Sequence, residues 1–272
     1  AVAVVDILEV VDVDHQQAEG VGRAASLLFT KEGAKLIAVD KTEGVKETVE
    51  QVRKAGGTAE AVIADAGLES DVKGFIAKAI STYGKLDAIW ANAGIGGGLV
   101  PLADQTPEHW QEVLRVNLIG PFLAVKHSIP HMVKQGHGAI VCTASVAGLK
   151  ANASGHPYAA SKAGVISLVQ TSANFYAGTG VRINAICPGL IETGMTQSVF
   201  DRARAHGAAG TNRNIQRPHG RDGHGDARQA PGAPPQRQAR RSRGRDRRER
   251  FAARGLRGVL RRGHGSDRLR RQ

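Results

Sequence analysis

Tyr158 and Lys162 form the residue pair in this chain whose types and spacing best suit acid–base chemistry. Four positions apart on a helix, they would project from the same face, where the ammonium group would favour the phenolate and lower the tyrosine pKa from about 10. A phenol tuned in this way can act as acid or base near neutral pH. Ser145 directly follows an apolar run and could donate a hydrogen bond to a substrate oxygen as negative charge develops there. Taken alone, Tyr-x-x-x-Lys is common in helices, and a serine after a strand is ordinarily a cap.

Two glycines near the start of the chain, Gly20 and Gly22, could bring the backbone close to a pyrophosphate. They open an amphipathic segment that ends near Gly33, and the N-terminus of a helix favours a bound anion. Asp40 ends the next apolar run, where a carboxylate would accept hydrogen bonds from an adenosine ribose and repel a 2′-phosphate. A bare Gly-x-Gly is usually a simple turn, and Asp40 could be a solvated loop acid. Together these residues favour NAD, while the adjacent Lys41 leaves room for NADP.

Apolar runs and helical segments alternate along the first 200 residues. Strands are expected at residues 35–40, 61–63, 86–90, 139–143 and 182–186, and helices at 72–83, 110–134 and 158–176, with two more ending near residues 33 and 56. Strands that alternate with helices at this spacing pair in parallel through right-handed crossovers. The pattern predicts a single α/β domain of Rossmann type with a doubly wound parallel sheet, whose ligands would bind beyond the carboxyl ends of the strands.

Five segments occur in a fixed order: NAG at 92–94, VNLIGPF around Asn117, IVCTASVAG with Ser145, YAASK at 158–162, and INAICPGLIET at 183–193. With these motifs, residues 20 to about 195 resemble the classical short-chain dehydrogenase/reductase family. The resemblance implies an oxidoreductase that moves a hydride between a nicotinamide cofactor and an alcohol or carbonyl substrate. The catalytic residues that it implies are Asn117, Ser145, Tyr158 and Lys162.

The resemblance also implies how the cofactor cleft is built. Asn117 keeps a helix kink and a water that relays protons to Lys162, which also binds the nicotinamide ribose. Asp65 meets the adenine, and Asn92 lies near the adenosine ribose. The implied cofactor-binding set is Gly20, Gly22, Asp40, Asp65, Asn92, Gly94, Tyr158, Lys162, Pro188, Ile191 and Thr193, the last three approaching the carboxamide. By itself, Asn117 could equally be a cap or a core asparagine, and the loop residues could be turn formers.

Two parts of the chain depart from the family pattern. The family's phosphate loop reads TGxxxGxG, but His15 and Gln16 stand where its Thr and first Gly belong, and a side chain at such a turn weakens the expected cofactor affinity. The preceding ILEVVDVDHQQ carries three acids where the central apolar strand or its exit is expected. After about Arg213, arginine-rich sequence replaces the family's last helix and final strand, so the terminal strand of the expected sheet is missing.

The positive charge of the chain is concentrated in its last part. The net charge is +12, yet residues 1–200 hold 16 Lys plus Arg against 19 Asp plus Glu, whereas residues 201–272 hold 21 arginines against 6 acids. A segment of this composition cannot bury enough apolar area to offset its chain entropy. A dehydrogenase domain is therefore expected over residues 1–212 and a disordered tail over 213–272. A one-base shift of reading frame across 257–264 permits a family-like segment, which favours a frameshifted gene over an evolved basic domain.

Composition also bears on compartment, metal and substrate. No stretch reaches the roughly 18 apolar residues of a membrane span and the start lacks a secretory signal, so a cytoplasmic protein without a membrane partner is expected. The two cysteines, Cys142 and Cys187, exclude a disulfide framework, and the histidines show no metal-ligand spacing, so no metal is assigned. The glycine-rich segment 95–99 has no charged anchor and is expected to be flexible. It favours a small neutral alcohol or ketone as substrate.

The arginine-rich tail and the departures from the family pattern allow two rival interpretations, and they also bear on the oligomeric state. The chain could be a catalytically inactive scaffold whose tail binds nucleic acid or another polyanion non-specifically, or a product that never folds stably. The family usually assembles through two long helices, here 110–134 and 158–176, and through a second interface made by the last helix and strand. Only the first interface is expected here, which predicts a homodimer.

Overall fold

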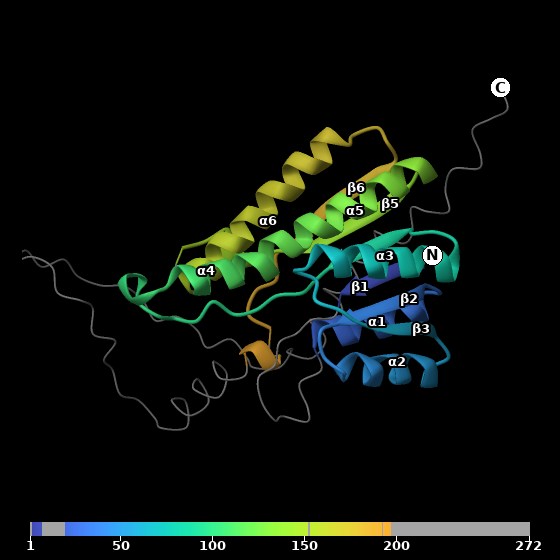
Figure 1. Ribbon diagram of the computed structural model, residues 1–272, viewed down its shortest axis with the longest axis horizontal. Coiled ribbons are helices and arrows are strands. Elements are labelled where there is room, and N and C mark those ends of the chain that lie inside the picture. The colour runs from blue at the N-terminus through green and yellow to red at the C-terminus, as the bar shows by residue number, and fades with distance from the viewer. Residues whose placement is uncertain (1, 7–19, 152, 192, 197–272) are drawn as a thin grey trace, which may run out of the picture.

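The computed structural model describes residues 2–6, 20–151, 153–191 and 193–196 (Figure 1). Within these residues six strands form one parallel sheet in the order β3-β2-β1-β4-β5-β6. The strands are β1 (Val2–Asp6), β2 (Lys35–Asp40), β3 (Thr58–Ile63), β4 (Ala88–Ala91), β5 (Gly138–Thr143) and β6 (Val181–Ile186). Because the strand order reverses between β1 and β4, the sheet is doubly wound, and the expected Rossmann-type α/β fold is confirmed.

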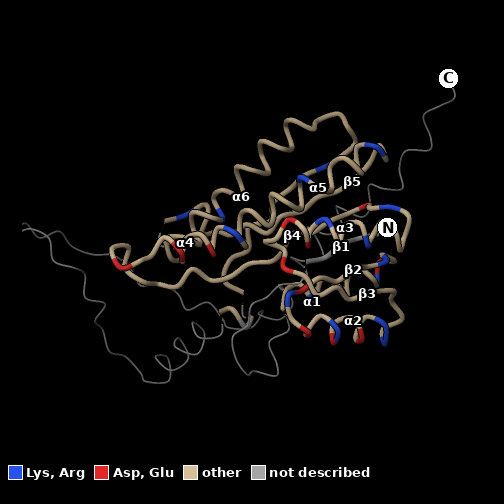
Figure 2. The backbone as a smooth tube through the Cα atoms, in the orientation of Figure 1, with Lys and Arg blue, Asp and Glu red and all other residues tan. Residues whose placement is uncertain are grey.

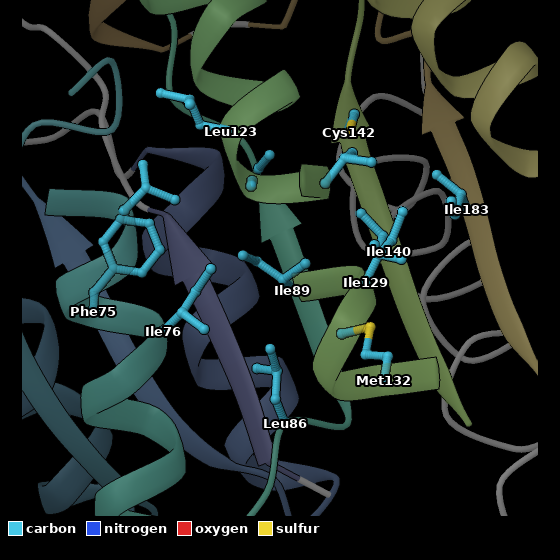
Figure 3. Packing of buried hydrophobic residues seen from close by; sticks show 14 of the residues in the cluster. Phe75, Ile76, Leu86, Ile89, Leu123, Ile129, Met132, Ile140, Cys142 and Ile183 are labelled. Atoms are coloured by element: carbon cyan, nitrogen blue, oxygen red, sulfur yellow. The ribbon is translucent and has the colours of Figure 1, made fainter. Parts of the chain in front are cut away.

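Helices cover both faces of this sheet. They are α1 (Val21–Lys31), α2 (Gly44–Lys54), α3 (Glu69–Tyr83), α4 (Pro107–Leu114), α5 (Gly120–Gln135) and α6 (His156–Phe175). One buried cluster packs α3, α5 and α6 against the sheet, and a second packs α1 and α2. Figure 3 shows the first cluster, in which Phe75 of α3 and Met132 of α5 converge on Ile89 of β4 and Ile140 of β5. The resulting three layers hold the carboxyl ends of the strands in fixed relative positions.

Local sequence explains why these elements form. Strand β2 is an unbroken apolar run buried from Leu36 to Asp40, as a strand covered on both faces requires. Helix α2 places Val45, Val49 and Val52 on one buried stripe and ends before Gly56, whose φ of +83° is readily adopted only by glycine. The strand–helix alternation is therefore encoded by periodicity at each step.

Several boundaries differ from those expected. The central strand β1 lies at residues 2–6, ahead of the acidic run 7–17, which is outside the described residues together with His15, Gln16 and the 213–272 tail. The expected single helix 110–134 consists of α4, a π-helical turn at Arg115–Ile119, and α5. The turn interrupts the regular helix where a kink was implied. None of the helices described is long and apolar enough to cross a membrane.

Candidate active site

The residues selected by type follow the carboxyl ends of the strands. Asp40 ends β2, Asp65 follows β3, Asn92 follows β4, Ser145 follows β5 and Pro188 follows β6. Because all the strands are parallel, these positions share one edge of the sheet. This edge includes the point between β1 and β4 where the strand order reverses, and ligands of doubly wound sheets bind at such a point. Along this edge Asp40 and Asp65 lie towards one end, and Ser145 and Pro188 lie towards the other. An extended dinucleotide would have to contact residues at both ends.

Helix α6 brings Tyr158 and Lys162 to this edge. The Lys162 Nζ lies 5.6 Å from the centroid of the Tyr158 ring and donates a 2.8 Å hydrogen bond to the carbonyl oxygen of Thr143. Lys162 is only 2% exposed, and burial lowers its pKa to about 8. The amine therefore gains and loses its proton close to neutral pH.

The pKa of Tyr158 is opposite in direction to the one expected. We expected Lys162 to lower it, but burial, the larger effect, raises the pKa of Tyr158 against the lowering effect of a hydrogen bond with Ser145. The physical reason is that the phenol is desolvated in the first turn of α6, while the amine lies over its ring and is itself buried. The expected lowering by Lys162 is wrong for this arrangement, although the pair does lie together.

Ser145 is both a cap and a neighbour of the phenol. Its Oγ accepts a 3.1 Å hydrogen bond from Ala147 N and caps the short 3-10 turn Val146–Gly148. Val146 N in turn donates to the Pro188 carbonyl at 3.0 Å, which ties this turn to the segment after β6. The cap uses the serine oxygen as acceptor, so its hydroxyl proton remains available for Tyr158 or a substrate oxygen.

The π-helical turn carries Asn117, which is fully buried. Its Oδ1 accepts from Ile95 N at 2.8 Å, and its Nδ2 donates to Ile95 O at 3.0 Å and to Ser161 Oγ at 3.2 Å. Ser161 Oγ donates to the Tyr158 carbonyl at 2.7 Å. Asn117 thus joins the loop after β4 to the helix that carries Tyr158, and Ser161 is a contact that sequence reasoning missed.

Gly94 lies directly against these groups. A Cβ at this position would lie 3.3 Å from both Asn117 Oδ1 and Lys162 Nζ, closer than side-chain atoms usually approach. The bare backbone lets Gly94 lie this close to both side chains, and the ammonium of Lys162 keeps two protons beyond its hydrogen bond to the Thr143 carbonyl. The residues present therefore fit a nicotinamide cofactor at this end of the site.

The other end of the site contains Gly20, Gly22 and Asp40. Gly20 is the N-cap of α1 and no side chain caps that helix, while Gly22 is buried and its carbonyl accepts from Ser26 Oγ at 2.9 Å. Asp40 is 6% exposed, so it is not a solvated loop acid. Burial raises the pKa of Asp40, and hydrogen bonds from Thr42 N (2.7 Å) and Oγ1 (2.8 Å) to Oδ1 oppose that shift. The backbone N–H and the charge of Lys41 also act to lower this pKa.

Asp65 has a partner that the sequence did not reveal. Its Oδ1 accepts from Gly67 N at 2.8 Å and its Oδ2 from Arg115 at 3.0 Å. Burial acts to raise the pKa of Asp65, but these hydrogen bonds and the guanidinium charge hold it below the ordinary value. Arg115 precedes Asn117 on the π-helical turn, so one turn contacts both ends of the site.

The segment after β6 folds back on itself. The hydroxyl of Thr196 donates to the Ile191 carbonyl and accepts a 3.0 Å hydrogen bond from Thr193 N. Thr193 is buried and Pro188 is tied to Val146 as described above. Pro188, Ile191 and Thr193 thus all lie beyond β6, and Pro188 is bonded to the turn that Ser145 caps.

The glycine-rich segment 95–99, which was expected to be flexible, contacts α4 and the start of α6. The Gly97 carbonyl accepts a 3.0 Å hydrogen bond from His109 Nε2, and a Cβ at Gly97 would lie 2.8 Å from Tyr158 N. A Cβ at Gly155 would collide with the Gly98 carbonyl oxygen. The glycines allow this segment to pack directly on the start of α6.

Two further features concern cysteine and metal chemistry. Burial raises the pKa of the Cys142 thiol to about 12, and Cys187 is half-buried; both are free thiols. Among the described residues no group of three or more His, Cys, Asp or Glu side chains could hold a metal ion.

Comparison with known proteins follows the same motifs. A family model described as short chain dehydrogenase matches residues 17–204. A 3-oxoacyl-[acyl-carrier-protein] reductase of Thermotoga maritima is 37% identical over 188 residues, covering 69% of this chain and 76% of that protein. A cis-4-hydroxycyclohexanecarboxylate dehydrogenase of Sinomonas cyclohexanicum is 35% identical over 192 residues, covering 71% and 77%. The crystal structure of an NAD+-bound xylitol dehydrogenase superposes with a TM-score of 0.66 at 28% identity, covering 75% of each chain.

Proposed function

The chain belongs to the short-chain dehydrogenase family, and we propose that it interconverts an alcohol and the corresponding carbonyl compound with a nicotinamide cofactor, using NAD in preference to NADP. The observation that carries this proposal is the cluster of Tyr158, Lys162, Ser145 and Asn117 at the carboxyl edge of the sheet. The bound cofactor supplies the acceptor or donor of the hydride. The chain's own residues then have to transfer the proton of the substrate hydroxyl group and to bind the substrate oxygen.

Tyr158 is the group that moves the proton in this proposal. When an alcohol is oxidised, its hydroxyl proton passes to the phenolate oxygen of Tyr158, and the carbon that bears the hydroxyl loses a hydride. In reduction the phenol returns a proton to the carbonyl oxygen. Ser145 donates a hydrogen bond to that oxygen, where negative charge develops. Because burial raises the pKa of Tyr158, the phenol is a proton donor at neutral pH and needs a nearby positive charge to act as a base.

Lys162 supplies that charge. Its Nζ keeps the Thr143 carbonyl as one partner, and two of its three protons remain for hydroxyl groups of a ribose. Hydrogen bonding to the charged amine opposes the effect of burial. Asn117 is hydrogen-bonded to Ile95 in the loop after β4 and to Ser161 in α6, and it therefore fixes these two elements on either side of Lys162 Nζ.

The NAD preference rests on Asp40. A 2′-phosphate carries close to two negative charges near neutral pH and would face a buried carboxylate whose Oδ1 is already engaged. A ribose hydroxyl can instead donate to Oδ2. The relative that is named an NAD+-bound dehydrogenase supports the same preference.

A small neutral alcohol or ketone is the proposed substrate. The loops beyond β4, β5 and β6 expose Leu99, Leu149 and Leu190, so the rim of the site offers apolar contact. Among the similar proteins, the xylitol dehydrogenase is named for a neutral sugar alcohol, whereas the Sinomonas cyclohexanicum enzyme is named for a ring alcohol that also carries a carboxylate. A cytoplasmic homo-oligomer completes the proposal.

Calorimetric titration of the purified chain with NADH and with NADPH tests the proposal, followed by turnover assays on a panel of cyclic and linear secondary alcohols. We expect NADH to bind more tightly and at least one alcohol to reduce NAD in a reaction that requires Tyr158. Absence of binding for both cofactors would overturn the proposed function, and equal use of NADP would overturn the NAD preference.

A further inference from the structure

Trp90 donates a hydrogen bond to a side chain at the carboxyl edge of the sheet. Its Nε1 lies 2.9 Å from Thr143 Oγ1, and that hydroxyl lies 2.9 Å from Asn92 Oδ1. Trp90 is in β4, Asn92 follows the same strand, and Thr143 ends the neighbouring strand β5. The three side chains therefore form a chain of hydrogen bonds across two strands.

The direction of this chain is fixed by its first member. An indole N–H can only donate, so Thr143 Oγ1 is the acceptor from Trp90. The single proton of the Thr143 hydroxyl then goes to Asn92 Oδ1. This assigns the carboxamide orientation of Asn92, because its oxygen must face Thr143 and its NH2 group must face the other way.

The NH2 group of Asn92 is left as a donor. Within the described part of the chain Asn92 Nδ2 has no hydrogen-bond partner, and the residue is only partly buried. Asn92 directly follows β4, which borders the point between β1 and β4 where the strand order reverses. Trp90 belongs to the cluster that packs on α1, so the hydrogen-bond chain lies on the side of the sheet where α1 begins. A donor oriented at this point can contact the sugar of a nucleotide.

We propose that Trp90 is a positioning residue for the cofactor: through Thr143 it fixes the Asn92 carboxamide with its NH2 group presented to the adenosine ribose. The inference rests on the proposed function, because it requires a nucleotide at this edge. It gives Trp90 a role beyond packing, and it makes Thr143 a shared support, since the Thr143 carbonyl holds Lys162 Nζ at 2.8 Å.

Packing alone accounts for the ring but not for its N–H. Trp90 is 3% exposed and makes an edge contact with Phe29 at 6.1 Å, which a phenylalanine ring could also make. The indole N–H, in contrast, donates to the Thr143 hydroxyl, whose single proton is donated to Asn92 Oδ1. Removing that N–H frees the hydroxyl to rotate and the carboxamide to turn over.

The test uses calorimetric affinities for NADH and for ADP, which contains the adenosine ribose but no nicotinamide. We expect Trp90→Phe and the nearly isosteric Thr143→Val to weaken both ligands by about threefold to tenfold, the range of one lost hydrogen bond. Thr143→Ser, which keeps the hydroxyl, should stay within about twofold of the parent. At saturating cofactor the kcat of Trp90→Phe and its pH profile should be unchanged, because this substitution does not touch the Thr143 carbonyl that holds Lys162.

A double substitution tests whether Trp90 acts through Asn92. With Asn92→Ala already present, Trp90→Phe should change ADP affinity by less than about twofold, because the two losses are not additive. Thermal unfolding of each variant identifies any that fails to fold, and Thr143→Val then carries the test with volume preserved. If the parent binds NADH and both Trp90→Phe and Thr143→Val bind equally well, the inference is overturned while the proposed function stands. If the parent binds neither ligand, the proposed function falls and the inference with it.

Discussion

Burial controls the ionisation of both members of the Tyr158–Lys162 pair. It raises the pKa of the phenol and lowers that of the amine to about 8, so each group is shifted towards its neutral form. Ligand hydroxyl groups that accept hydrogen bonds from the ammonium would raise its pKa again, and its charge would favour the phenolate. Tyr158, which exchanges the proton in the proposed reaction, is therefore the residue to remove first.

Tyr158→Phe is expected to lower the turnover of any alcohol that the parent oxidises by at least about a hundredfold, because it removes the one hydroxyl that exchanges the proton. The ring and its packing remain, so the melting temperature should stay near that of the parent. Steady-state kinetics with circular dichroism as the control provide the measurement. Activity within tenfold of the parent would contradict the assignment.

Lys162 predicts a specific dependence of stability on pH. Its pKa is about 8 in the folded chain and near 10.5 when exposed, so the unfolded chain binds more protons between these values and stability rises with pH across that window. From pH 7.5 to 9.5 this contribution to the unfolding free energy is on the order of 1–2 kcal/mol. Urea unfolding should show the rise in the parent and lose it in Lys162→Met. Parallel profiles for the two proteins would mean that the amine is not buried as described.

Asp40 is predicted to set the cofactor preference. Asp40→Ala removes the carboxylate that would repel a 2′-phosphate, so the ratio of NADPH to NADH dissociation constants should move towards one by roughly tenfold, about one charge interaction at a partly buried site. Asp40→Asn, which keeps the shape and loses the charge, separates repulsion from lost hydrogen bonding. A parent that binds NADP as well as NAD would refute the role given to Asp40.

Helices and strands could be predicted from the sequence wherever the spacing of apolar residues distinguishes one from the other. Strand β2 and helix α2 follow from an apolar run and a 3.6-residue stripe, and the order of motifs led to the site edge. Contacts between distant elements were not predictable, because sequence spacing does not contain the register between strands. The Arg115–Asp65 and Trp90–Thr143 hydrogen bonds join residues 50 and 53 positions apart, and only the assembled sheet reveals them. The burial that reverses the expected pKa of a site tyrosine depends on tertiary packing in the same way.

The packing of segment 95–99 on α6 gives a prediction at the scale of elements. In Gly155→Ala the added methyl group would collide with the Gly98 carbonyl oxygen, so the loop has to move away from the start of α6. We expect a loss of about 1–3 kcal/mol in unfolding free energy, typical of overpacking, and a raised substrate KM. Gly74→Ala is the matched control, because it lies inside α3 with open space around it and should be neutral or slightly stabilising. Equal stability of the two variants would show that the loop is not held against α6.

Across the part of the molecule that the structure describes, helix α6 presents a long surface that lacks charge. Helix α6 runs for 20 residues with Lys162 as its only charged side chain, and that side chain is buried (Figure 2). Phe175 at its end is 79% exposed, and Phe122 on neighbouring α5 is 40% exposed. An uncharged helix face beside two exposed phenylalanine rings suits an interface between copies, and a two-fold arrangement would cover it on both chains at once.

We therefore predict that the purified chain is a dimer through α5 and α6. Family members add a second interface from their last helix and strand, for which the arginine-rich sequence 213–272 offers no counterpart in residue type. The two-fold interface closes after two chains, so light scattering should give twice the chain mass of 28.7 kDa, and the value should be constant on dilution until the dimer dissociates. Within the described sheet β6 pairs only with β5, and an open edge of this kind favours slow aggregation at high concentration. A stable tetramer would contradict the prediction, because it requires a second surface that this sequence was not expected to supply.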